Sequence, residues 1–190
     1  MRRHRLGRPQ RRTVFLGREG DSERAYGALI SRLHEEHRHD LYLHVVLLKP
    51  GGGDPLTLVE RACHSIVEYE RKRDIRYAVR AVLLDGDRRG QSPQRDMRMV
   101  ELAQSTHLRF IWQEPCHEAL LLRHLEGCQT LRPPSSALAM VELRRRWPDY
   151  VKGVSAVQLA KRISIREIAW AASVEPSLRE FLYAIGFPIR

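Results

Sequence analysis

Short apolar runs alternate with longer segments in which apolar residues recur every three or four positions over the first two thirds of the chain. The runs fit strands buried on both faces, and the periodic segments fit amphipathic helices. Strands are expected at residues 13–16, 41–48, 77–84 and 108–112. One helix is expected to begin at Asp21 or Ser22, either of which can cap it, and the next at Asp54 as its cap with Pro55 at the first helical position. Two more are expected to begin at Ser92–Pro93 and at Pro115, the last ending at Gly127. This alternation predicts a parallel sheet with right-handed crossovers.

The last third of the chain shows helical patterns only. Residues 131–136 are rich in proline and serine and read as a linker. Helical patterns follow over residues 138–147, 157–170 and 178–185. We therefore expect a basic flexible arm at residues 1–12, an α/β domain at residues 13–130, and a helical extension packed on it at residues 131–190.

The net charge of the chain indicates a class of partner. The chain has 33 Lys and Arg against 23 Asp and Glu, a net charge of +10, which favours nucleic acid as the partner. Phosphate contacts are expected from two groups of arginines: Arg2, Arg3, Arg5, Arg8, Arg11 and Arg12 in the arm, and Arg88 and Arg89 further on. The alternative is that the arm only aids solubility, or reflects an Arg-rich genome.

Other classes of protein are not indicated by the sequence. No apolar run approaches the ~18 residues of a membrane span, and the first residues lack the apolar centre of a signal peptide. The three cysteines are odd in number and show no C-x-x-C spacing, so neither a disulfide framework nor a zinc site is expected. We expect a cytoplasmic protein without membrane contact.

Carboxylates follow three of the four expected strands. Asp85 and Asp87 flank a glycine directly after the third strand, Glu19 follows the first, and Glu118 comes just after the fourth. Glu23 is expected in the first turn of the helix after Glu19. The carboxyl ends of parallel strands meet at one edge of a sheet, so these acids are expected to share a divalent-cation site. The alternative is that each acid only favours the positive end of a helix dipole, as would suit Glu23.

Several acids around one cation are typical of metal-assisted phosphoryl chemistry. A lysine such as Lys152 would add positive charge where the transition state becomes more negative. Two other classes use similar acidic pairs. Haloacid-dehalogenase-type phosphatases and receiver domains both place the pair after the first strand, whereas here it follows the third, so both fit poorly.

The order of these motifs carries a resemblance to a known family. Glu19-Gly20-x-x-Glu23 after a first strand, with Asp85-x-Asp87 after a third, resembles the Toprim fold. More narrowly, the chain is similar to the RloB-like family, relatives of the OLD-type Toprim nucleases. Supporting motifs lie at residues 53–62, 115–124 and 150–152, so that the resemblance covers roughly residues 11–153.

The resemblance implies a Mg²⁺- or Mn²⁺-dependent nuclease, commonly acting in phage defence beside a P-loop ATPase partner. It makes Glu19 a metal ligand or general base, Asp85 and Asp87 the metal-binding pair, and Glu23 and Glu118 further ligands. Lys152 would be the phosphate-stabilising base. The fold implied is a Toprim-like parallel sheet of about four strands flanked by helices, with a small C-terminal helical extension.

The chain also departs from the family near Glu118. Glu114 and His117 stand where an asparagine and an aromatic residue are expected, and Ala119-Leu120 lacks the usual tryptophan. A second function class is a non-catalytic Toprim-like subunit that binds nucleic acid or docks on an ATPase. Such a subunit would bind in a salt-dependent way that survives loss of Glu19 and Asp85.

Overall fold

A single parallel sheet forms the centre of the protein. The computed structural model describes residues 11–38, 40–48 and 54–189. Its strands are β1 (Arg12–Arg18), β2 (Leu41–Leu47), β3 (Tyr77–Asp85) and β4 (Leu108–Gln113), in the spatial order β2-β1-β3-β4. Each neighbouring pair is parallel. The predicted Toprim-like α/β arrangement, with four parallel strands flanked by helices, is confirmed.

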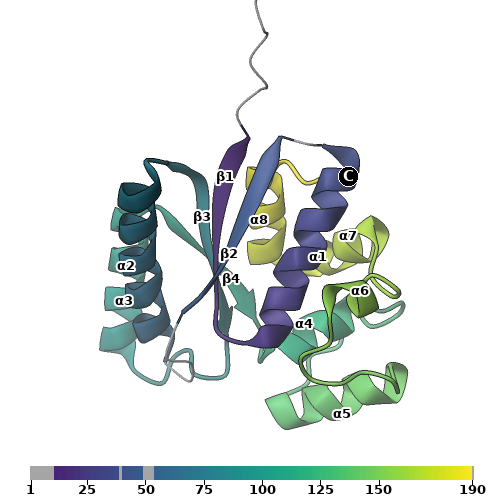
Figure 1. The fold of residues 1–190 in the computed structure, drawn as a ribbon. Helices are drawn as coiled ribbons and strands as arrows, with labels where there is room; N and C mark the ends of the chain where they lie inside the picture. Colours follow the sequence, from purple (N-terminus) through teal and green to yellow (C-terminus); the bar gives the residue numbers. More distant parts are fainter. Residues whose placement is uncertain (1–10, 39, 49–53, 190) are drawn as a thin grey trace, which may run out of the picture.

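Helices cover both faces of this sheet (Figure 1). They are α1 (Asp21–His37), α2 (Pro55–Arg73), α3 (Pro93–Ser105), α4 (His117–Arg123), α5 (Ser136–Arg146), α6 (Ala156–Leu159), α7 (Ile165–Val174) and α8 (Pro176–Ile185). The connection through α1 runs across the sheet in one direction, and those through α2 and α3 run in the other. Right-handed crossovers therefore place α1 on one face and α2 and α3 on the opposite face.

Alternating side chains of the strands feed two hydrophobic cores. Val14 and Leu16 of β1 pack in a cluster with α1, whereas Phe15 between them packs in a second cluster with α2 and α3. Leu83 and Val82 of β3 divide in the same way. Each such side chain, fully buried, contributes about 1.5–3 kcal/mol, which explains why the central strands are apolar on both faces.

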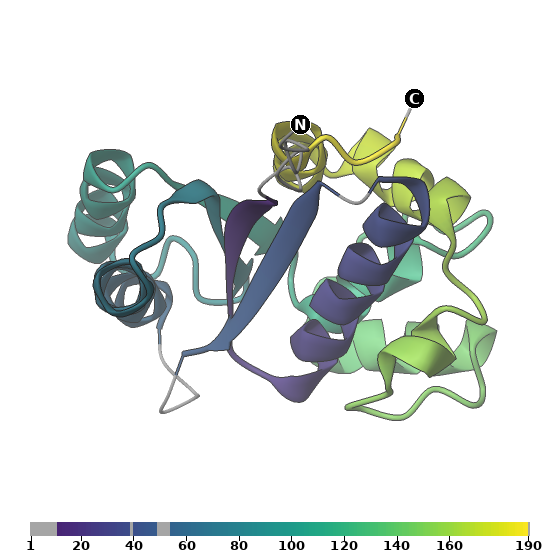
Figure 2. The ribbon, with the colours of Figure 1, turned by 45° about the horizontal axis from the view of Figure 1, so that its top comes forward.

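The C-terminal helices join the core on the α1 face. Residues of α5, α7 and α8 belong to the same hydrophobic cluster as α1 and the sheet, and Figure 2 shows α8 beside the sheet while α2 and α3 lie on the other side. Two polar contacts reinforce this packing. Arg123 Nε lies 3.1 Å from Glu175 Oε1, and the backbone N–H of Trp112 donates to Ser177 Oγ at 3.0 Å.

Three helix ends differ from the prediction. The N-cap of α1 is Gly20, without a side-chain cap, so neither Asp21 nor Ser22 caps this helix. The fourth helix begins after Cys116 rather than at Pro115 and ends well before Gly127. By contrast, Asp54 caps α2 with Pro55 at the first helical position, as predicted. Within the described residues, no helix combines the length and apolarity needed to cross a membrane.

Candidate active site

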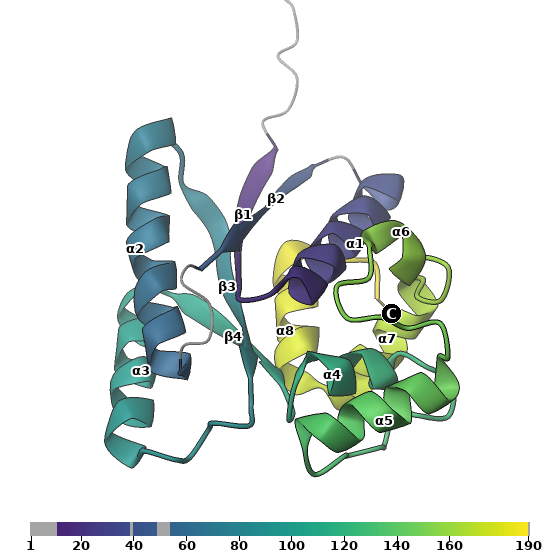
Figure 3. The ribbon, with the colours of Figure 1, turned by 60° about the horizontal axis from the view of Figure 1, so that its bottom comes forward.

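The strand order places a crevice between β1 and β3. These two strands are neighbours at the centre of the sheet, and the chain leaves them toward opposite sides. At such a switch point the loops after the two strands diverge, and α/β proteins bind ligands there. The loop after β1 holds Glu19, and β3 ends at Asp85 with Asp87 close behind. Figure 3 views this end of the sheet, with α1 and α4 beside it.

A cavity of about 400 Å³ opens at this point. Its lining includes four residues that the sequence singled out: Glu19, Glu23, Asp85 and Lys152. They come from the turn after β1, the first turn of α1, the end of β3 and the segment before α6. Residues separated by more than 130 positions along the chain thus meet at one cavity.

Asp85 lies at the centre of the charge in this region. Among the described residues, no hydrogen-bond partner reaches its buried Oδ1. Burial first, and then the charges of nearby carboxylates, raise the pKa of Asp85 to about 8. These neighbours are the other four predicted ligands: Glu23, Asp87, Glu118 and Glu19. We call these five residues the acidic site, and a carboxyl perturbed this way in a crevice marks a functional candidate.

Glu23 also has a structural task at the start of α1. It is the third residue of the helix, and its carboxylate accepts hydrogen bonds from its own backbone N–H and from that of Gly20. A Cβ at Gly20 would lie 2.7 Å from Glu23 Oε2, so this approach needs glycine. Burial and then the charge of Glu118 raise the pKa of Glu23. Glu23 therefore lies at the positive end of the α1 dipole, as the alternative interpretation expects, and it is also one of the five residues of the acidic site.

The segment after β3 is fastened to the segment after β4. The backbone N–H of Gly86 donates to the carbonyls of Gln113 and Pro115, each at 3.0 Å, and that of Asp87 donates to Pro115 at 3.1 Å. The carboxylate of Glu114 lies against Gly86, where any Cβ would collide with it. Glu114 is an acid at this edge that the sequence analysis did not select. Its place directly after β4 was the available signal.

Glu118 and Lys152 approach each other at the edge of the acidic site. Glu118 is buried in the first turn of α4, and its Oε1 has no hydrogen-bond partner among the described residues. Lys152 Nζ lies 3.9 Å from that oxygen, while the lysine side chain is 75% exposed. The lysine segment is attached to α1, because the backbone N–H of Gly153 donates to Ser22 Oγ at 3.0 Å. Ser22 is buried and was expected only as a helix cap.

Two of the predicted phosphate-contacting arginines lie at the same edge as the acidic site. Arg88 is exposed directly after Asp87. Arg89 has its guanidinium 4.7 Å from the Trp112 ring centroid and pairs with Glu114 at 3.4 Å. A further arginine, Arg18, is buried at the end of β1 and donates to the Gly20 carbonyl at 2.8 Å. Its signal was a lone cation closing an apolar strand.

The arginines before β1 lie at the opposite edge of the sheet. Arg11 pairs with Glu35 at 3.2 Å and Arg12 with Asp40 at 3.4 Å. Because β1 extends from Arg12 to Arg18, about 20 Å of extended chain separates them from the acidic site. They cannot contact the phosphate that Asp85 would face. Four arginines lie outside the described residues: Arg2, Arg3, Arg5 and Arg8.

The donor atoms of the acidic site are of the type that Mg²⁺ and Mn²⁺ bind, but their positions do not form a complete set of ligands. Carboxylate oxygens are the donors that these hard cations take, and buried oxygens of Asp85 and Glu118 lack hydrogen-bond partners within the described chain. Yet, in the ranges that the structure describes, no group of three or more His, Cys, Asp or Glu side chains is placed so that it could hold a metal ion. Metal binding would therefore require side-chain movement.

Comparison with family models, with curated proteins and with solved structures found no match for this chain. The resemblance to the RloB-like family therefore stays a prediction, and the evidence for a function is the geometry of the acidic site.

Proposed function

We propose that the protein is a divalent-metal-dependent nuclease that hydrolyses phosphodiester bonds in DNA or RNA. The observation that carries this proposal is Asp85, a half-buried residue at the switch point of a parallel sheet, whose buried Oδ1 has no hydrogen-bond partner among the described residues. Four further carboxylates raise its pKa, and a lysine lines the same cavity. So many negative charges close together are costly in a folded protein unless a cation offsets them.

Each residue of the site has a role in this chemistry. Asp85 and Asp87 would hold the cation with Glu19, while Glu23 and Glu118 complete the donor set. A bound Mg²⁺ or Mn²⁺ supplies positive charge to the scissile phosphate and acidifies a water molecule. Glu19, which follows β1 and lines the cavity, would accept the proton of the attacking water.

Lys152 would contact the phosphate itself. Its exposed ammonium lies at the rim of the cavity, 3.9 Å from the buried Glu118 carboxylate. That carboxylate keeps the ammonium close to the acidic site, where positive charge stabilises the developing charge on the phosphate. Arg88 and Arg89 extend the positive surface along the same edge, and the net charge of +10 favours binding of a polyanion.

Cleavage of supercoiled plasmid and of total RNA, with Mg²⁺ or Mn²⁺ and with EDTA as the control, tests the proposal. Asp85→Asn should abolish cleavage in a folded protein. Asp74→Asn is the matched control, because it makes the same substitution just before the other end of β3, at a left-handed position that asparagine tolerates. Metal-dependent cleavage that Asp85→Asn leaves unchanged would refute the assignment.

A second candidate is a non-catalytic subunit that binds nucleic acid or docks on an ATPase. What favours it is the net charge of +10 together with the exposed Arg88 and Arg89, which can bind a polyanion without any metal. It predicts salt-dependent binding without cleavage, unchanged in Glu19→Gln and Asp85→Asn. A role in phage defence and a P-loop ATPase partner are proposed from the RloB-like resemblance alone. Cleavage assays with and without a co-expressed ATPase distinguish this subunit from the nuclease.

A further inference from the structure

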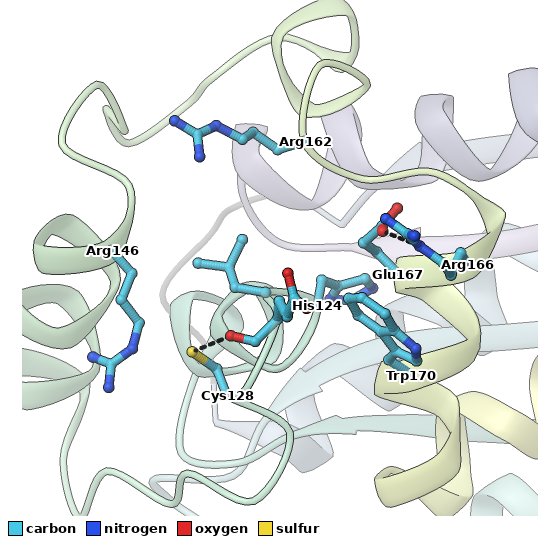
Figure 4. A pocket seen from close by; sticks show the side chains of 9 residues that line it. His124, Cys128, Arg146, Arg162, Arg166, Glu167 and Trp170 are labelled. Carbon is cyan, nitrogen blue, oxygen red and sulfur yellow. Dashed lines mark hydrogen bonds and ion pairs between the residues drawn. The ribbon is translucent and has the colours of Figure 1, made fainter.

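A second cavity lies among the helices on the α1 face, away from the crevice between β1 and β3. It has a volume of about 420 Å³ and is formed where the ends of α4 and α5 meet the start of α7. Three arginines from three segments line it: Arg146 at the end of α5, Arg162 between α6 and α7, and Arg166 in the first turn of α7. We call it the arginine cavity. Figure 4 shows the three side chains on different sides of it.

Two of the three guanidinium groups have an acidic partner. Arg166 Nε lies 2.8 Å from Glu167 Oε1, and its guanidinium is 5.0 Å from the centroid of the Trp170 ring. Arg146 pairs with Glu142. Arg162 lies 5.8 Å from the centroid of Trp147, and no acidic side chain in the described ranges comes within 4.0 Å of it. Arg146, which is mostly covered and already paired, loses little further freedom when it binds an anion. The exposed Arg162 is open to a new anionic partner.

Two carboxylates line the arginine cavity, fewer than the guanidinium groups, and one of them also accepts a backbone hydrogen bond. The Glu167 carboxylate accepts the backbone N–H of Ser164 at 2.8 Å in the capping box of α7, in addition to the contact with Arg166. Glu126 is an exposed second carboxylate of the lining. Within the lining, the three guanidinium groups outnumber these two acids. A third acid, Glu142, lies outside the lining and is shared between Arg145 and Arg146.

The floor of the arginine cavity is uncharged. The buried imidazole of His124 contacts Tyr26 Oη at 3.1 Å and the Leu120 carbonyl at 2.9 Å. Burial lowers the pKa of His124 to about 4, so the ring is neutral at physiological pH. A neutral floor below a cationic rim, with Trp170 on one wall, suits a ligand that joins a flat apolar part to an anionic part (Figure 4).

We propose that the arginine cavity binds a nucleotide. Guanidinium groups match the oxygens of a phosphate with paired hydrogen bonds, and Trp170 with the Arg166 plane offers a surface on which a base stacks. The volume is in the range of small-ligand sites. This inference goes beyond the proposed nuclease function and needs neither metal nor catalysis.

The position of the cavity allows two sources of that nucleotide. α4 joins the two sites, with Glu118 in its first turn and His124 directly after its end. Six residues of helix advance about 9 Å, so a strand held at the acidic site could place a neighbouring nucleotide in the arginine cavity. A free mononucleotide is the other source of the same chemistry.

Isothermal titration calorimetry of the full chain, without divalent metal, tests the proposal. The probes are a 5′-mononucleotide, inorganic phosphate, and a short single-stranded oligonucleotide with or without a 5′-phosphate. Arg162→Gln and Arg146→Gln should each weaken nucleotide binding about tenfold. Arg144→Gln is the matched control, because Arg144 lies on the same helix as Arg146, is exposed, and does not line the cavity.

The outcomes separate the sources and the ways in which the proposal fails. Tighter binding of the mononucleotide than of the oligonucleotides supports a free nucleotide, and tighter binding of an oligonucleotide supports a strand. Equal weakening by Arg144→Gln and Arg162→Gln would overturn the proposal, because it would indicate diffuse charge attraction. Inorganic phosphate binding as tightly as the mononucleotide would overturn it as well, as would no binding at millimolar concentration. None of these results depends on whether the protein cleaves nucleic acid.

Discussion

Removing the negative charge of Asp85 should make the folded protein more stable. Burial and four neighbouring carboxylates raise the pKa of Asp85 from an ordinary 3.8 to about 8. The folded state therefore retains a proton on Asp85 at pH values where the unfolded chain has lost it. Where the folded state binds more protons, stability falls as pH rises. Asp85→Asn replaces this carboxyl with a neutral group of the same shape, so the variant lacks the cost.

The magnitude follows from the two pKa values. At 1.36 kcal/mol per pKa unit, Asp85 costs the folded protein as much as about 4 kcal/mol at pH 7 relative to an unperturbed carboxyl. The cost begins near pH 4 and reaches its full size above pH 8. The stability advantage of Asp85→Asn should therefore grow by up to about 1.4 kcal/mol for each pH unit between pH 5 and pH 8.

Urea denaturation of both proteins at pH 5, 6, 7 and 8, in metal-free buffer, measures this difference. Using the difference between variant and wild type cancels the titration of every group that the substitution leaves undisturbed. Asp74→Asn, measured in parallel, controls for the substitution itself. If the advantage of Asp85→Asn stays constant with pH, Asp85 has an ordinary pKa in the folded protein. That result would refute the claim that burial and four neighbouring carboxylates perturb it.

Three further predictions concern the same edge of the sheet and its supporting core. Mn²⁺ affinity, measured by calorimetry, should rise between pH 6 and pH 8, by at most about tenfold per pH unit, because Asp85 must release its proton to become a ligand; pH-independent affinity would contradict this. Gly86→Ala should cost less than about 1 kcal/mol, because its Cβ meets only the end of the partly exposed Glu114 side chain, which can turn away and give up its pair with Arg89. In a Glu114→Ala background the same substitution should cost nothing further, and a loss above about 3 kcal/mol that persists in that background would contradict this. Burial lowers the pKa values of His117 and His124 to about 4, so the unfolded chain binds more protons below pH 6.5, and stability should fall by about 2 kcal/mol for each histidine from pH 7 to pH 5. Denaturation of Asp85→Asn tests this without the opposite trend of the aspartate, and NMR signals of these rings that titrate near pH 6.5 would refute it.

Much of the acidic site could be predicted from the sequence because most of its residues follow local apolar patterns that identify strands. Glu19, Asp85 and Glu118 each come just after a strand whose apolar run identifies it, and parallel strands end at one edge of the sheet. The same reasoning placed the Asp54 cap of α2. Strand direction also held a signal that was not used: residues at or before the start of a strand, such as Arg11 and Arg12 for β1, lie at the edge of the sheet away from the end of that strand.

Contacts between distant segments could not be found in this way. Nothing local to Gly86 indicates that the Glu114 carboxylate lies against it, and nothing near Ser22 indicates that it accepts the Gly153 N–H. Each contact depends on how neighbouring elements are placed. The arginine cavity is a further case, since its arginines look like ordinary solvated charges until α5 and α7 are packed beside α4.

The sequence by itself determined the alternation of strands and helices, because hydrophobic burial imposes a different period on each and glycine, proline and capping residues mark the ends. It also determined that acids stand after β1, β3 and the start of α4. Only the tertiary structure decided that β1 and β3 are neighbours, since strand order depends on the packing of helices on both faces of the sheet. That decision brings Glu19 and Asp85 to one cavity and raises the pKa of the aspartate.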